Sequence, residues 1–235
     1  MDRSRLPTPV AQPAAATLPA ALGAATVPAS AAAVLRSTYL LLSMTLLFSA
    51  AVATASAAWK LPAPGILITL VGFYGLLFGI YKMRDSLWSL PMVFALTGFM
   101  GYTLGPILAR YAGLPGGGET IAMALGLTGV TFVAMSAYAI QSRRDFSFLG
   151  GFLLAGMVIA VLAGLAAMFF EMPALSLAVS AAVALLSAGL ILFETSNIVN
   201  GGETSPVMAT VSLFVSIFNL FSSLLGLLGM GGSEE

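Results

Sequence analysis

The chain contains seven long apolar segments separated by short polar ones. They lie near residues 38–58, 64–81, 87–109, 119–141, 146–170, 174–199 and 206–229. Each segment holds about 18–26 residues, and at a rise of about 1.5 Å per residue this length crosses a hydrocarbon core of roughly 30 Å. The separators are rich in Pro, Gly, Asn and Asp, the residues typical of turns. The pattern therefore predicts an all-α integral membrane protein with seven transmembrane helices.

The first 33 residues differ in composition from the rest of the chain. They are rich in Ala, poor in bulky apolar residues and interrupted by Pro7, Pro9, Pro13, Pro19 and Pro28. Such a composition predicts a disordered tail over residues 1–33, ahead of a transmembrane domain over residues 34–235. The alternative is a signal peptide, because Arg3 and Arg5 precede apolar residues and residues 29–31 imitate a cleavage site. The prolines break every apolar core of the required length, which favours the tail.

The overall composition narrows the possible functions. Charged residues make up 8% of the chain, whereas a soluble domain carries about 25%. The net charge is zero, so no basic surface points to nucleic acid. The chain has no Cys and no His, which removes disulfides, thiolate nucleophiles, imidazole bases and the usual zinc sites. We therefore expect no enzymatic activity, no cofactor and no bound metal.

The positions of Lys and Arg predict the orientation of the bundle. The side that holds the N-terminus carries seven of the nine basic residues, namely Arg3, Arg5, Arg36, Lys82, Arg84, Arg143 and Arg144. The opposite side carries Lys60 and Arg110. Because short loops rich in Lys and Arg stay in the cytoplasm, we expect the N-terminus there. An odd number of spans then places the C-terminus on the outer side.

Glu194 is an acid well inside a predicted span. A carboxylate in hydrocarbon costs about 2.5 kcal/mol or more, so it is expected to face the bundle interior. In the seventh span, one helical face carries Ser212, Ser216, Asn219 and Ser223. The two faces are expected to meet, with Glu194 near Ser216 or Asn219. Two interpretations remain open: a structural acid hydrogen-bonded near the cytoplasmic surface, or a proton or cation site.

Glycines in the third span predict a close helix contact. Gly101 and Gly105 are four residues apart, a spacing that lets two helices approach closely, here in ordinary packing within the chain. Pro106 follows and is expected to kink the helix, because proline cannot donate the backbone hydrogen bond.

Several longer stretches resemble a known family. They lie at residues 34–39, 98–108 (with Gly105 and Pro106), 144–151 (beginning Arg144-Asp145), 191–204 (with Gly201, Gly202 and Glu203), 209–213 and 217–221. Together they are similar to the Bax inhibitor-1 family over about residues 34–229. Within that family the likeness is greatest to the bacterial branch that modulates the FtsH protease.

The resemblance implies six helices around a central seventh, in a bilayer that would be the bacterial inner membrane, with the C-terminus periplasmic. It implies FtsH as a partner, with HflK and HflC as possible associates. Other members are described as pH-sensitive calcium leak channels that use two Asp residues. Here Glu194 matches the first of these positions and Ser216 stands at the second. Because calcium prefers several charged oxygens, this difference favours protease modulation, with calcium or proton passage as the alternative.

Overall fold

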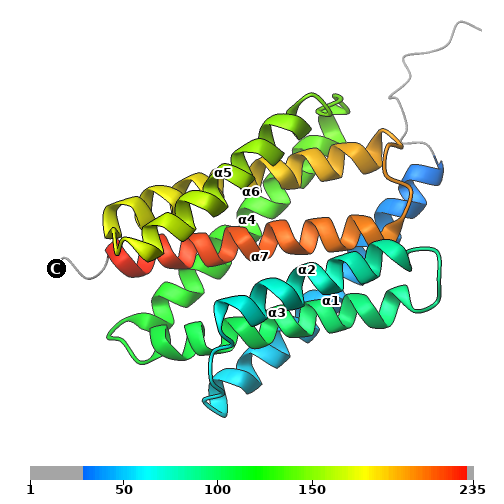
Figure 1. The fold of residues 1–235 in the computed structure, drawn as a ribbon. Helices are drawn as coiled ribbons and strands as arrows, with labels where there is room; N and C mark the ends of the chain where they lie inside the picture. The colour runs from blue at the N-terminus through cyan, green and yellow to red at the C-terminus, as the bar shows by residue number, and fades with distance from the viewer. Residues whose placement is uncertain (1–28, 232–235) are drawn as a thin grey trace, which may run out of the picture.

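The computed structural model describes residues 29–231, and these residues form seven helices and no strand (Figure 1). The helices are α1 (Ala29–Ala58), α2 (Ile66–Lys82), α3 (Ser89–Ala112), α4 (Gly117–Ser142), α5 (Leu149–Phe169), α6 (Pro173–Val199) and α7 (Pro206–Gly231). Each predicted apolar segment overlaps one of these helices over most of its length, which confirms the predicted fold class. Six of the helices are long and apolar enough to cross a membrane, and α2, with 17 residues, is shorter.

The first helix begins earlier than the apolar pattern indicates. Its first residue is Ala29, so the last five residues of the predicted tail are helical. The reason is local: Pro28 stands just before a run of Ala residues, and Ala has the highest helix propensity. The remainder of the predicted tail, residues 1–28, lies outside the described residues.

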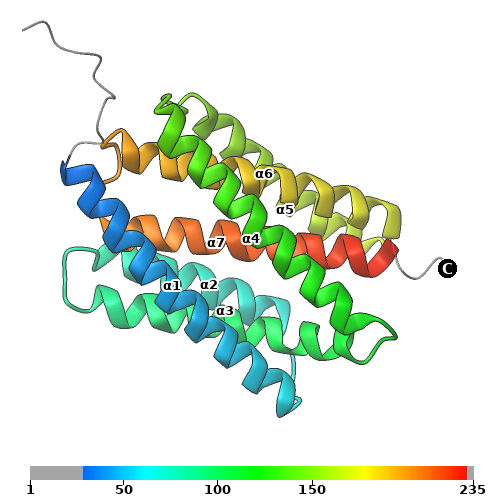
Figure 2. The same cartoon turned by 180° about the vertical axis from the view of Figure 1, so that it is seen from behind.

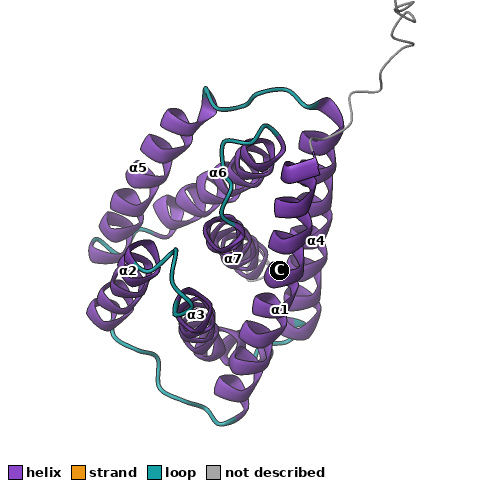
Figure 3. Ribbon diagram, turned by 90° about the vertical axis from the view of Figure 1, so that its right-hand side faces the viewer, coloured by secondary structure: helices purple, strands orange, loops and turns teal. Residues whose placement is uncertain are grey.

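Helix α7 lies at the centre of the bundle. Viewed along its axis, the other helices surround it, and it packs against α6, α1, α4 and α3 (Figure 3). The views from front and back agree that α1, α4 and α6 run beside it (Figures 1 and 2). By contrast, α2 packs mainly on α3 and α5 on α6, so these two helices are peripheral. The central seventh helix implied by the family resemblance is confirmed.

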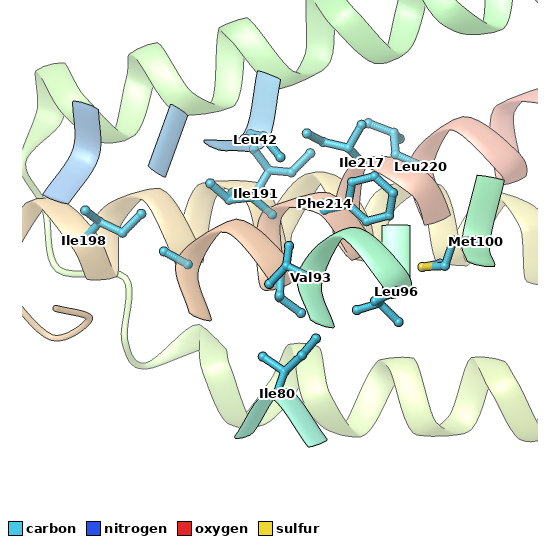
Figure 4. Close-up of a cluster of buried hydrophobic side chains, with 13 residues drawn as sticks. Leu42, Ile80, Val93, Leu96, Met100, Ile191, Ile198, Phe214, Ile217 and Leu220 are labelled. Carbon is cyan, nitrogen blue, oxygen red and sulfur yellow. The ribbon is translucent and has the colours of Figure 1, made fainter. Parts of the chain in front are cut away.

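The core is built around the inner part of α7. Phe214 is almost fully buried and lies among Leu42 of α1, Leu96 of α3 and Ile191 of α6 (Figure 4). Tight apolar packing of this kind holds helices together in a bilayer, where water supplies no hydrophobic driving force between them.

The outer surface of the bundle is apolar. Leu67, Phe152 and Leu185 each expose more than two thirds of their side chain, and an apolar surface of this extent suits lipid rather than water. Trp59, just after α1, and Trp88, just before α3, are also largely exposed. They lie at opposite ends of the bundle, where tryptophan typically marks the two membrane interfaces.

Helices α1 and α3 touch backbone to backbone. A Cβ atom on Gly101 would collide with the Ser49 carbonyl oxygen, and one on Gly105 would collide with the Ser56 side chain. Helix α3 continues through Pro106 to Ala112. The predicted close approach therefore lies between these two helices of the same chain.

Candidate functional site

The turn between α6 and α7, residues 200–205, begins with a glycine-dependent helix end. Gly201 adopts a left-handed conformation with φ +77°. Its N–H donates to the Ile198 carbonyl at 3.1 Å, and the N–H of Gly202 donates to the Asn197 carbonyl at 2.8 Å. This pair of bonds is a Schellman motif, which glycine favours. A Cβ atom on Gly202 would collide with the Asn197 side chain, so both glycines shape this turn.

Glu203 and Ser205 start α7 on the other side of the turn. The Glu203 carboxylate accepts the Ser205 backbone N–H at 2.7 Å, and the Ser205 hydroxyl accepts the Met208 N–H at 3.4 Å. Pro206 is the first helical residue. Proline suits this position, because the backbone N–H that it lacks would have no acceptor within the helix. Glu203 therefore has a structural role at the entrance to α7.

Glu194 lies partly buried on α6, beside the Ser212 hydroxyl of α7. The antiparallel hairpin explains this pairing, because Glu194 lies six residues before Asn200 and Ser212 six residues after Pro206. The short turn thus brings the two to the same depth. Since Ser212 is polar and Glu194 can accept a hydrogen bond, the contact between α6 and α7 is polar at the depth of these two residues.

Ser216 and Asn219 follow Ser212 on the same face of α7, further from the turn. At a rise of about 1.5 Å per residue they are roughly 6 and 10 Å further along α7 than Ser212. Ser216 is buried and donates to the Ser212 carbonyl at 2.9 Å. Among the described residues no hydrogen bond joins Glu194 to Ser216 or Asn219. The length of the turn sets this register, which helical periodicity alone does not reveal.

A second carboxylate near Glu194 comes from the turn. It is that of Glu203, the residue that also accepts the Ser205 N–H. Within residues 29–231, the ion pair is Arg84–Asp85, at 3.5 Å on the surface, so neither glutamate has a basic partner within ion-pair distance. Two carboxylates without a cation can attract a proton or a cation. The described residues contain no cluster of three or more typical metal-binding side chains.

The loop between α4 and α5, residues 143–148, is held by the end of α6. The Arg144 carbonyl accepts the Ser196 hydroxyl at 2.9 Å and the Asn200 side-chain amide at 3.3 Å. The Ser196 hydroxyl also accepts the Phe146 N–H at 3.2 Å. Thus the two sequence stretches that contain Arg144 and Gly201 meet in space. Ser196 and Asn200 were not singled out in the sequence, although their spacing of four residues places them on one helical face.

Asp145 has a local structural role in the same loop. Its carboxylate accepts hydrogen bonds from the Ser147 hydroxyl and the Ser147 backbone N–H. These bonds stabilise the charged form and hold the pKa of Asp145 below its usual value. Asp145 therefore orders the chain as it enters α5.

The remaining motif residues lie elsewhere. Gly105 and Pro106 are near the far end of α3, roughly 24 Å along the helix from its start, at the contact with α1. The structure therefore separates them from Glu194 and from the two loops described above.

Comparison with known proteins identifies the family. Residues 31–233 match the sequence model of the family described as inhibitor of apoptosis-promoting Bax1. The chain is 53% identical to the modulator of FtsH protease YccA of Escherichia coli K12, over 86% of this chain and 91% of that protein. It has the same identity and coverage to the inner membrane protein YccA of Escherichia coli O6:H1.

An uncharacterised protein of Pseudomonas aeruginosa is 50% identical over 86% of this chain and 91% of its own. None of these three names describes an enzyme. The family match covers every helix of the described structure almost completely, and the fold agrees with it. This multi-pass helical membrane protein therefore belongs to the Bax inhibitor-1 family.

Proposed function

We propose that this chain is a bacterial inner-membrane protein that binds the FtsH protease and modulates its activity. The observation that carries the proposal is the 53% identity to a named modulator of FtsH, which extends over 86% of this chain. Similarity at this level over nearly the whole bundle favours a shared role. The excess of Lys and Arg on the side of the N-terminus supports a cytoplasmic N-terminus and a periplasmic C-terminus.

The fold supports a mechanism based on competition. A protease that extracts membrane proteins must pull helices out of the bilayer one after another. Here the central α7 contacts four other helices, and α1 is in direct backbone contact with α3. A bundle held in this way resists extraction. The segment before α1 would engage the protease in the cytoplasm while the bundle resists removal, and so occupy the enzyme.

Co-purification tests the partnership directly. The protein carries a tag at its C-terminus and is purified from its native membrane in mild detergent. The proposal predicts that FtsH co-purifies in stoichiometric amount, and HflK and HflC are sought in the same sample. Overproduction should also slow the turnover of a membrane substrate of FtsH. A folded preparation without FtsH, together with unchanged substrate turnover, would refute the proposal.

A second candidate function is a cation or proton pathway centred on Glu194. The observation that favours it is the partly buried Glu194 beside Ser212, with Glu203 nearby and no basic partner at ion-pair distance in the described structure. Ser216 and Asn219 continue the polar face inward along α7. Calcium and proton flux into liposomes tests this function. Glu194→Gln should abolish flux and Ser216→Asp should raise calcium flux, whereas Glu119→Gln at the other end of the bundle should change neither.

A further inference from the structure

An apolar groove runs along the outside of the bundle between α5 and α6. Its volume is about 560 Å³, and carbon atoms line almost all of it. The two helices lie side by side there (Figures 1 and 2). The floor is formed by the buried residues Leu153 and Ala160, and the rims by the exposed side chains of Phe152 and Leu185. The groove is therefore open to the surrounding membrane.

Glycines set the shape of this groove. The Leu186 side chain lies against Gly156, and the Leu153 side chain lies against Gly189, so each helix receives a leucine from the other. This interlocking brings the helices close together, and the groove runs along their contact line. From Leu149 to Ala163 the groove follows α5 for roughly 21 Å at about 1.5 Å per residue. It therefore extends beyond the half-thickness, about 15 Å, of a hydrocarbon core.

One end of the groove is basic. Leu149, the first residue of α5, lines the groove. Arg143 and Arg144 lie in the loop just before it, and the Arg144 carbonyl is bound to Ser196 and Asn200 at the end of α6. The loop is thus fixed over the ends of both helices that form the groove. Neither arginine forms an ion pair with a residue in the described part of the chain, and Asp145 is bound to Ser147.

We propose that the groove holds one acyl chain of an anionic phospholipid, whose phosphate lies against Arg143 and Arg144. The apolar groove suits the hydrocarbon chain of the lipid, and the two guanidinium groups suit its negatively charged phosphate at the membrane surface. A transmembrane helix is about 10–12 Å across with its side chains and would rest on Phe152 and Leu185. An acyl chain is narrower and reaches the floor at Leu153. The shape and the charge therefore favour a lipid.

Native mass spectrometry of delipidated protein tests this site. Phosphatidylglycerol, which is anionic, or phosphatidylcholine, which is zwitterionic, is added back at equal concentration. The wild-type protein should bind one phosphatidylglycerol in clear preference to phosphatidylcholine, with a matching rise in Tm. Equal binding of the two lipids would overturn the proposal. So would competition by glycerol phosphate, which lacks acyl chains, because the groove would then contribute nothing.

Two variants separate the groove from the basic end. Ala182→Phe fills the groove from an exposed position and should weaken phosphatidylglycerol binding at least tenfold. Its matched control is Ala181→Phe, an exposed neighbour outside the groove, which should bind as the wild type does. Arg143→Gln with Arg144→Gln should remove the preference for the anionic lipid, while Arg110→Gln at the opposite end should preserve it.

Several results would refute the lipid site. Binding unchanged in Ala182→Phe, or equally reduced in Ala181→Phe, would remove the groove from the explanation. A photocrosslinker at Leu185 that captures a protein helix in native membranes, in place of lipid, would assign the groove to a partner protein. Circular dichroism and Tm without added lipid establish that each variant is folded before its binding is compared.

Discussion

The Ser56 hydroxyl of α1 donates a hydrogen bond of 3.1 Å to the Tyr102 carbonyl of α3. This carbonyl lies four residues before Pro106, which has no N–H, so it lacks the partner that an α-helix normally supplies. The neighbouring helix provides the missing donor. Because Gly105 has no side chain, Ser56 comes close enough to do so. The proline, the glycine and the serine thus form one structural unit across two helices.

Ser56→Ala is expected to destabilise the bundle by about 1–3 kcal/mol, because it leaves the Tyr102 carbonyl unpaired in an apolar setting. Pro106→Ala restores an N–H within α3, so the same Ser56→Ala change should cost much less in that background. Unfolding of the four proteins of this double-mutant cycle in detergent measures the coupling. Equal costs of Ser56→Ala in both backgrounds would show that the serine and the proline act independently.

Gly201→Ala is expected to destabilise the protein by about 1–2 kcal/mol, since an L-residue is strained in the left-handed conformation that Gly201 adopts. Gly201→Asn should cost less, because Asn tolerates this conformation better. The control is Gly126→Ala in α4, where an added Cβ meets open space and stability should stay the same or rise. The thermal unfolding midpoints of the three variants decide whether the turn requires a positive φ.

Protonation of Asp145 is expected to loosen the start of α5 in acid. Its folded pKa lies below the unfolded value because of the bonds from Ser147. The stabilising contribution is therefore present above the unfolded pKa of about 3.9 and is lost as the pH falls through the folded value. Hydrogen-exchange protection of residues 148–151, compared at pH 3 and pH 5, measures the change.

Asp145→Asn should remove this pH dependence and leave protection at its acid level throughout. Asp85→Asn, in the loop between α2 and α3, is the matched control and should leave the start of α5 as it is in the wild type. If the wild type and Asp145→Asn respond to pH alike, another group controls this helix end.

Deletion of residues 2–28 should weaken the effect on FtsH turnover and leave the bundle inserted and folded. The deletion stops before Ala29, where α1 begins, so α1 is kept whole. Substrate turnover by FtsH in cells and the Tm of the purified protein are the two measurements. An undiminished effect on turnover would rule out competition through this segment, while co-purification with FtsH would still test the partnership.

The sequence predicts the helices better than their register. Seven apolar segments predict seven helices, because the bilayer requires long apolar runs and hydrogen-bonded backbone. The pair Gly101 and Gly105 predicts a close contact, but the sequence does not name α1 as the partner. The sequence predicts that the polar faces of α6 and α7 meet, and Ser212 of that face of α7 lies beside Glu194. Which residue of the face lies there depends on the length of the α6–α7 turn, which helical periodicity does not encode.

The central position of α7 has a consequence for the order of assembly. It is the last of the seven helices to leave the ribosome, yet α1, α3, α4 and α6 all pack against it. The earlier helices enter the bilayer with their inner faces still uncovered, and the Thr210 hydroxyl meets the Thr38 carbonyl only after α7 has been made. Insertion and final folding are therefore separate events in time. Between them the chain is an open bundle, the state in which a membrane protein is most vulnerable to misfolding and degradation.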